Sequence, residues 1–244
     1  LLILAYPAFS HDLFNYMFDS RIITKYQLSP YFFKALDFPA DHWTRFMRWT
    51  HRYYPYGPGW LWLSLIPSYL GGGKFVSTLI LFKLLFASFH LTNCILIKKI
   101  LTKISPRHAQ AGLMFYAMNP LILVESLASP HNEVVMLTLV LLSIYLLVLS
   151  KKFFSLIFLA LSVSIKYFSV VLLPIYLLAG SDNWDQRFKA GFYLWLFSLI
   201  PAVILREPYS WYIVPLVGLA ALCQSSKFIP KLSLALSLST LLRY

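Results

Sequence analysis

The amino-acid sequence predicts an all-α integral membrane protein, a polytopic bundle of about 8–10 apolar helical segments, some of them short or broken. Hydrophobic residues make up 59% of the 244 positions and charged residues only 12%, with a mean hydropathy of +0.68. A soluble domain carries about 25% charged residues, so this chain cannot cover itself with a water-facing surface. The apolar residues also gather in runs that short polar turns separate.

These apolar runs are the predicted helices. In chain order they are Pro58–Leu70, Phe75–Ile97, Ala109–Leu127, Val134–Leu149, Phe153–Ile165, Tyr167–Leu178, Ala190–Leu205, Trp211–Leu222 and Leu232–Leu242. A full crossing needs about 20 residues, and several runs are shorter, so we expect kinked or half helices around an internal site. We expect Pro58–Leu70 to be re-entrant or interfacial. Phe153–Ile165 and Tyr167–Leu178 could form two short passes or one kinked crossing.

A single transmembrane domain, residues 1–244, accounts for the whole chain. Leu1–Phe9 reads as the end of an apolar span and Leu232–Tyr244 stops inside another, so we expect truncation at both ends. Between the first two apolar segments lies a polar, aromatic loop, residues 10–57, with four of the nine acidic residues. We expect this outer loop to carry the chemistry.

Positive charge dominates, with 21 Lys and Arg against 9 Asp and Glu, for a net charge of +12. The basic residues form short clusters between apolar runs, as expected of loops that face an anionic cytoplasmic leaflet, and no basic face is left for nucleic acid. The clusters at 98–107 and 151–152 belong on the cytoplasmic side, which places the Ser129–Glu133 turn outside. Cys94 and Cys223 are expected to be buried thiols rather than a disulfide.

Two amphipathic interface helices are predicted within the outer loop. In His11–Lys25, helical spacing separates two faces, a polar one with Asp12, Asn15, Tyr16 and Asp19 and an apolar one with Phe14, Met17, Phe18 and Ile22. Such a helix can lie on the membrane surface, with its apolar side in lipid or against the bundle. Asp41–Arg52 is the second predicted helix.

Several short motifs follow one another along residues 5 to 180. They are 10–16 (SHDLFNY), 19–21 (DSR), 29–31 (SPY), 56–58 (YGP), 119–121 (NPL), 129–133 (SPHNE), 166–167 (KY) and 173–174 (LP). This ordered set resembles the GT-C superfamily of membrane glycosyltransferases. It is most similar to polyprenyl-phosphate-mannose-dependent mannosyltransferases and to glycosylphosphatidylinositol mannosyltransferases.

The resemblance implies an inverting glycosyltransferase, a mannosyltransferase by family, with a polyprenyl-phosphate sugar donor and a glycan or glycolipid acceptor. In that family the first outer loop supplies an essential acidic residue, and Asp12 matches its position. Some relatives carry two acidic residues there, whereas His11 precedes Asp12 and Asn15 follows it in this chain. That departure weakens a metal site built on paired acids. A multi-pass place in the membrane is implied, with a prokaryotic cytoplasmic membrane favoured over the endoplasmic reticulum.

The reaction itself needs a base for the acceptor hydroxyl and positive charge near the leaving phosphate. Asp12 is the candidate base. The candidate substrate-binding residues are Arg21, Tyr56, His131, Glu133, Lys166 and Asp19. Arg45, Arg48 and Arg52 are a further source of positive charge. A divalent metal would serve the same purpose, but no cofactor is specified.

Other interpretations remain open at this level. Asp12 could cap the helix that begins at Leu13. Broken helices with buried Lys or Glu also suit a multi-pass transporter or lipid flippase. A scaffold within a membrane complex would tolerate any change at Asp12.

Overall fold

The computed structural model describes residues 2–177, 183–205, 207 and 209–244, and this part of the chain is helical without any strand. The α-helices are α1 (Asp12–Tyr26), α2 (Pro58–Leu70), α3 (Phe75–Ile104), α4 (Ala109–Ala117), α5 (Pro120–Leu123), α6 (Glu133–Val148), α7 (Lys152–Ile165), α8 (Leu173–Leu177), α9 (Trp184–Ser198), α10 (Ile200–Leu205), α11 (Val214–Leu222) and α12 (Ile229–Leu241). A π-helical turn, Val124–Ala128, follows α5, and a 3-10 turn, Ser210–Ile213, precedes α11. The predicted all-α class is confirmed.

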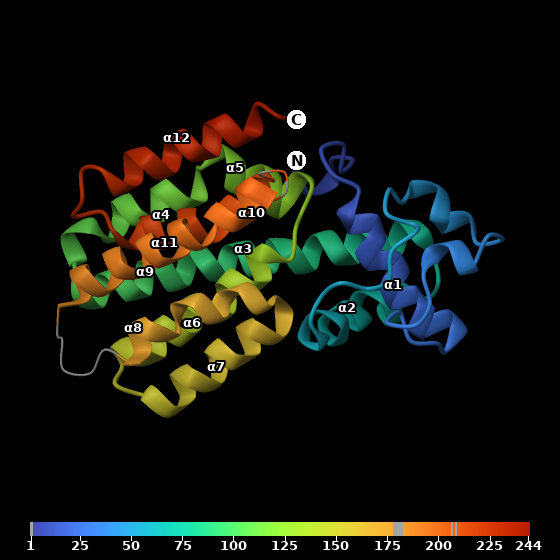
Figure 1. The fold of residues 1–244 in the computed structure, drawn as a ribbon, viewed down its shortest axis with the longest axis horizontal. Coiled ribbons are helices and arrows are strands. Elements are labelled where there is room, and N and C mark those ends of the chain that lie inside the picture. The colour runs from blue at the N-terminus through green and yellow to red at the C-terminus, as the bar shows by residue number, and fades with distance from the viewer. Residues whose placement is uncertain (1, 178–182, 206, 208) are drawn as a thin grey trace.

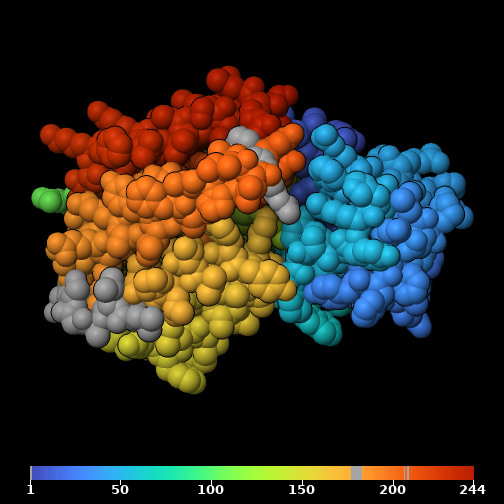
Figure 2. Space-filling model, in the orientation of Figure 1, coloured from blue at the N-terminus to red at the C-terminus, as the bar shows by residue number. Residues whose placement is uncertain are grey.

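Helix α3 is the axis of the molecule (Figure 1). At one of its ends lie α1, α2 and the loop that joins them, and along the rest of its length pack the remaining helices. In the space-filling view the same division separates the blue and cyan N-terminal part from the orange and red C-terminal helices (Figure 2). The two described chain ends meet near the junction, where the rings of Phe9 and Tyr244 are 5.2 Å apart.

Two helical stretches, Phe75–Ile104 and Trp184–Leu205, are long and apolar enough to cross a membrane. A third results if Pro106–Ala117 and Pro120–Ala128, which meet at 54°, act as one broken span. The other apolar helices of the bundle are shorter, at 10–17 residues. The prediction of short and broken segments is therefore confirmed in part, while the number of crossings is not decided by helix length.

The outer loop differs from the prediction in two ways. Helix α1 begins and ends within one residue of the predicted His11–Lys25, but it is buried on both faces instead of lying on a surface, since α2, α3 and the 3-10 turn His42–Phe46 pack around it. Of the second predicted helix, Asp41–Arg52, only that 3-10 turn is helical. Trp43 and Phe46 both contact the ring of Phe75, at 5.2 and 4.4 Å, so tertiary packing shapes this segment.

The first predicted span also differs, because Leu2–Leu4 forms a single 3-10 turn. Helix α2 coincides with its predicted bounds and packs on α1, α3 and α7; its interfacial place stays a prediction. Between α7 and α8 the backbone is extended at Lys166, and the chain reverses so that α8 runs back beside α7 (Figure 1). Phe153–Ile165 and Tyr167–Leu178 are thus two separate segments, although Leu178 lies outside the described residues.

Helices α6 and α7 form an antiparallel hairpin that serine side chains hold together. Ser143 Oγ donates to the carbonyl of Ser155 at 2.5 Å, and Ser155 Oγ donates to the carbonyl of Ser143 at 2.8 Å. Nearer the other end, Ser162 Oγ donates to the carbonyl of Met136 at 3.0 Å. Small residues allow this close approach, and each hydroxyl is satisfied inside an apolar bundle. The hairpin presents Glu133 and Lys166 at its open end.

The basic clusters gather at the opposite end of the bundle. Lys99 of α3 lies 5.9 Å from the ring of Tyr145, near the end of α6. This contact brings the 98–107 cluster close to the 151–152 turn. Arg107, Asp185 and Ser225 line one small cavity, so the start of α9 and the end of α11 lie there as well. The charges that were predicted to share one side of a membrane therefore share one end of the fold.

We expect Gly57→Ala to lower the free energy of unfolding by about 1–3 kcal/mol. Gly57 N donates to the Ile165 carbonyl at 3.2 Å, and a Cβ on Gly57 would lie 2.1 Å from the carbonyl oxygen of Ser164. Gly191→Ala is the control, because a Cβ there meets its nearest atom at 3.7 Å and alanine favours a helix. Thermal unfolding of the detergent-solubilised protein measures both. An equal loss for the two variants would contradict the close approach at Gly57.

Candidate active site

Asp12 is the first residue of α1 and not its cap, since His11 occupies the cap position without a side-chain cap bond. Its side chain is nearly buried and faces the turn that joins the π-helical segment to α6. His131 Nε2 lies 3.7 Å from Asp12 Oδ2 and 3.0 Å from Ser10 Oγ. Phe9 N donates to Ser129 Oγ at 3.1 Å. Two predicted site regions, separated by more than a hundred residues, thus meet.

His131 stands between two carboxylates. Its Nδ1 lies 2.5 Å from Glu125 Oε2, and its ring stacks on Trp211 with centroids 4.3 Å apart. Burial alone would lower the pKa of His131, but Glu125 opposes this, and Asp12 and Glu133 add to the effect, so the pKa is raised above its ordinary value. The neighbouring carboxylates thus favour the cationic form of the imidazole.

A second group lies around Lys166. Its ammonium pairs with Glu133 Oε1 and sits 5.8 Å from the ring of Tyr56. Arg52 donates to the Tyr56 hydroxyl at 3.2 Å. Tyr16 of α1 contacts the Tyr56 ring edge-on at 5.3 Å. Glu133 of this group is two positions after His131 along the chain, and Tyr16 lies on α1 with Asp12, so the two groups form one region.

Asp19 lies about two turns after Asp12 on α1 and is half-buried. Burial raises the pKa of Asp19 to about 8, an effect that Arg52 opposes and Asp12 reinforces. The raised pKa favours the protonated carboxyl group, which can donate a hydrogen bond. This makes Asp19 a weaker candidate for a base than Asp12 and a better one for a substrate contact.

Unsatisfied buried polar atoms concentrate in this region. Among the described residues, no hydrogen-bond partner is found for Asp12 Oδ1, Asn15 Oδ1, Glu133 Oε2 or either side-chain polar atom of Asn132. Buried polar atoms are normally paired, because leaving one unpaired costs about 1–3 kcal/mol. Their concentration around Asp12 and Glu133 is what a site for a hydroxyl-rich ligand requires.

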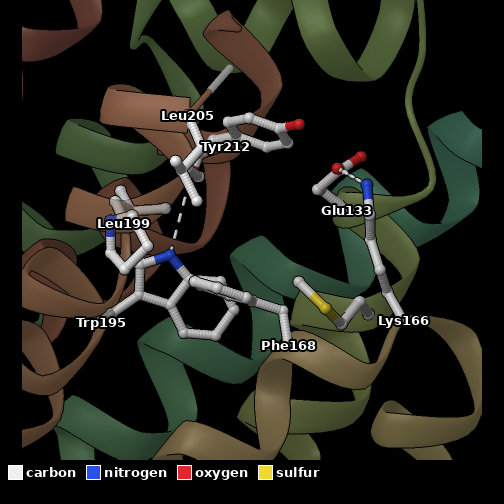
Figure 3. Close-up of a pocket in the computed structure, with 10 residues that line it drawn as sticks. Glu133, Lys166, Phe168, Trp195, Leu199, Leu205 and Tyr212 are labelled. Carbon is white, nitrogen blue, oxygen red and sulfur yellow. Dashed lines mark hydrogen bonds and ion pairs between the residues drawn. The ribbon is translucent and has the colours of Figure 1, made fainter. Parts of the chain in front are cut away.

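Two cavities flank the region. A polar cavity of about 410 Å³ is lined by Asp12 together with Arg48, Trp49, Tyr209 and Trp211. An apolar cavity of about 320 Å³ lies on the other side of the Ser210–Ile213 turn. In Figure 3 the Glu133–Lys166 pair stands on one side of the apolar cavity, and Phe168, Trp195 and Leu199 stand on the other. A polar and an apolar cavity therefore adjoin the same charged turn.

Arg21 is the one predicted site residue that lies in a different cluster. Its Nε donates to Asp41 Oδ2 at 2.8 Å, and its guanidinium lies 3.9 Å from the centre of the Trp43 ring. Lys25 and Tyr26 donate to the same carboxylate oxygen at 2.9 and 2.7 Å. Burial would raise the pKa of Asp41, but these bonds hold it well below its usual range. Arg21 thus fastens the outer loop to α1.

Several residues that line the site were absent from the predicted set. Glu125, Ser210, Trp211 and Tyr244 surround His131 directly or through one partner. The dense aromatic run Tyr209–Tyr212, directly after a proline, was the available signal. Of the three loop arginines, Arg48 lines the polar cavity and Arg52 contacts Tyr56, whereas Arg45 Nη2 lies 3.2 Å from His42 Nδ1.

No group of three or more His, Cys, Asp or Glu side chains is arranged to hold a metal within the described ranges. Both cysteines are free thiols; Cys223 is buried as predicted, whereas Cys94 is half-buried.

Comparison with known proteins gives one family match. Residues 2–181, well over half of the chain, match the MptA_B family model described as Alpha-(1->6)-mannopyranosyltransferase, N-terminal domain. This match confirms the resemblance to mannosyltransferases that the ordered motifs predict. No curated protein and no solved structure matches.

Opposite pH dependences are expected for Asp19 and Asp41. Between about pH 4 and 8 the folded protein keeps a proton on Asp19 that the unfolded chain has lost, so stability falls as pH rises through this window. Asp19→Asn should therefore match the wild type at pH 4 and be more stable at pH 9.

Asp41 stabilises the folded protein above its unfolded pKa of about 4, and this contribution is lost at lower pH. Asp41→Asn should destabilise at pH 7. Unfolding temperatures across this range measure both, and equal pH profiles for the two variants would contradict the assignments.

Proposed function

This chain belongs to the MptA_B family of alpha-(1->6)-mannopyranosyltransferases, and on that premise we propose that it moves a mannose from a polyprenyl-phosphate donor to a glycan or glycolipid hydroxyl. The observation that carries this proposal is the pair of cavities beside Asp12, His131 and Glu133, one polar and one apolar. A lipid-linked sugar phosphate has the same two parts, a charged polar head and a long apolar chain.

We place the reaction at the outer face of a membrane that the chain crosses several times. Successive helices run between the basic end of the bundle and the Asp12 end, and the basic clusters at 98–107 and 151–152 favour a cytoplasmic place for their end. Helices shorter than a full crossing are compatible with this, since neighbouring helices cover their ends. The alternation supports a multi-pass arrangement with the site outside.

In the proposed reaction the acceptor hydroxyl oxygen attacks the anomeric carbon, the bond from that carbon to the phosphate oxygen breaks, and the hydroxyl proton passes to Asp12. A single displacement inverts the anomeric configuration. Asp12 suits the role of base because it lines the polar cavity and its Oδ1 is buried without a partner among the described residues.

The leaving lipid phosphate gains charge as the bond breaks, so cations near it lower the barrier. Lys166 stands at the rim of the apolar cavity, and Arg48 lines the polar one. His131 adds positive charge next to Asp12. Tyr56 and Glu133 would hold sugar hydroxyls between these cations, and Asp19 would donate from its protonated carboxyl group.

Asp12→Asn should lower the rate of sugar transfer by about 10²–10⁴-fold with little change in donor affinity, because asparagine keeps the shape but cannot accept the proton. Asp37→Asn is the matched control, since Asp37 is an exposed aspartate of the same loop that accepts a hydrogen bond from Lys34 N at 2.9 Å. The measurement is transfer from a panel of polyprenyl-phosphate sugars in membranes. Near-normal turnover by a stably inserted Asp12→Asn protein would remove the base assignment.

The apolar cavity predicts an effect that depends on the length of the donor lipid. Ala202→Phe should fill part of this cavity and raise KM for a long-chain donor by at least about tenfold, since each excluded methylene forfeits about 0.8 kcal/mol. A short-chain sugar phosphate should be affected much less. Val203→Phe, an exposed neighbour that does not line the cavity, is the control. Equal changes for long and short donors would contradict a lipid site here.

A further inference from the structure

Glu125 is a fully buried carboxylate that no step of the proposed reaction uses. It lies in the π-helical turn Val124–Ala128, with no exposed surface. Ser210 donates to its Oε1 at 2.6 Å, and the Tyr244 hydroxyl donates to the same oxygen at 2.8 Å. Its other oxygen, Oε2, lies 2.5 Å from His131 Nδ1. A buried charge of this kind is retained only when it is paired, so its partner identifies its role.

The imidazole of His131 transmits this contact to the candidate base. Nδ1 faces Glu125, so the opposite ring nitrogen, Nε2, is left for Ser10 at 3.0 Å and Asp12 at 3.7 Å. Trp211 stacks on the ring and fixes its plane. The order carboxylate, imidazole, carboxylate runs from the bundle interior to the polar cavity. The group that contacts one ring nitrogen influences whether the other nitrogen carries a proton.

We infer that Glu125 is a positioning residue for the proposed transfer: its carboxylate, 2.5 Å from Nδ1, holds the ring of His131 in place and favours its cationic form, with Nε2 beside Ser10 and Asp12. The inference rests on the proposed function in so far as Asp12 is the base. It predicts that the charge of Glu125, and not only its volume, sets the protonation of His131.

The groups that face His131 all favour this state. Glu125 contributes most, followed by Asp12 and Glu133, whereas burial opposes it. Ser10, whose hydroxyl lies 3.0 Å from Nε2, is neutral, and the hydroxyls of Ser210 and Tyr244 reach His131 only through Glu125. Among these neighbours there is no cation to compete with Glu125 for the ring.

The first readout is independent of turnover. In the full-length protein, labelled with ¹⁵N-histidine and placed in lipid nanodiscs, His131 should titrate above the ordinary histidine value of about 6.5. Assignment comes from the signal that His131→Gln removes among the six histidines. In Glu125→Gln the His131 titration should move to lower pH. Titration at or below about 6.5 in the wild type would overturn the inference, even if the variant fails to fold.

The second readout is the pH dependence of transfer. Glu125→Gln should lower kcat at neutral pH by about 10–10²-fold, part of what general acid–base catalysis supplies, and move the alkaline limb of kcat to lower pH with donor KM nearly unchanged. Tyr244→Phe is the matched variant, because it removes one hydrogen bond from Glu125 but leaves its charge, and its alkaline limb should stay in place. A purely structural Glu125 would lower the unfolding temperature and protein yield without moving the limb.

The outcomes separate the inference from the proposed function. A shifted His131 titration in Glu125→Gln with unchanged kcat would overturn the positioning role while leaving the transfer reaction intact. An equal limb shift in Tyr244→Phe would also overturn it. Absence of transfer by the wild type with every sugar-phosphate donor would instead contradict the proposed function itself.

Discussion

The buried contact between Glu125 and His131 is the interaction on which the site's geometry depends. An unpaired carboxylate inside an apolar bundle costs several kcal/mol, so Glu125 must find donors wherever the chain can supply them. They come from three places that are remote in sequence: the Ser129–Asn132 turn, the Ser210–Ile213 turn and the last described residue, Tyr244. Through His131 the same network reaches the start of α1 and Asp12. Satisfying one charge therefore brings the chain ends and two turns around one cavity.

Asp41 is also a buried carboxylate that needs donors, but its role is structural. Its Oδ2 accepts from Arg21, Lys25 and Tyr26, and its Oδ1 accepts from Trp43 N, so both oxygens are fully engaged. Such a carboxylate has no capacity left for a substrate, and its role is to fasten the outer loop to α1. Asp12 and Glu133 are buried as well, yet each keeps one oxygen without a partner among the described residues. Residual hydrogen-bonding capacity separates the carboxylates of the site from those of the scaffold.

Broken helices give the site its shape. A continuous helix through Lys166 would carry its ammonium away from Glu133, whereas the extended backbone there turns it toward the cavity rim. Part of the cavity walls comes from beyond the stretch that matches the family: Tyr209, Trp211 and Tyr244 line the polar cavity, and Trp195 and Leu199 line the apolar one. The candidate site residues Asp12, His131 and Lys166 thus lie in the stretch that matches the family's N-terminal domain, while part of the enclosure is supplied by later helices.

The sequence by itself determined the helical class, the bounds of α1 and α2, and the motifs that place Asp12, His131 and Lys166 in a mannosyltransferase family. Composition, periodicity and motif order are local properties, and each can be assessed within a few turns of chain. The sequence did not reveal that Arg21 pairs with Asp41, that Asp41–Arg52 is mostly irregular, or that Glu125 contacts His131. Those facts depend on contacts such as Ser10 with His131 and Glu125 with Tyr244, which span 121 and 119 positions. Only the tertiary structure decides them, because a buried charge is paired by whichever donor the packed helices bring within reach.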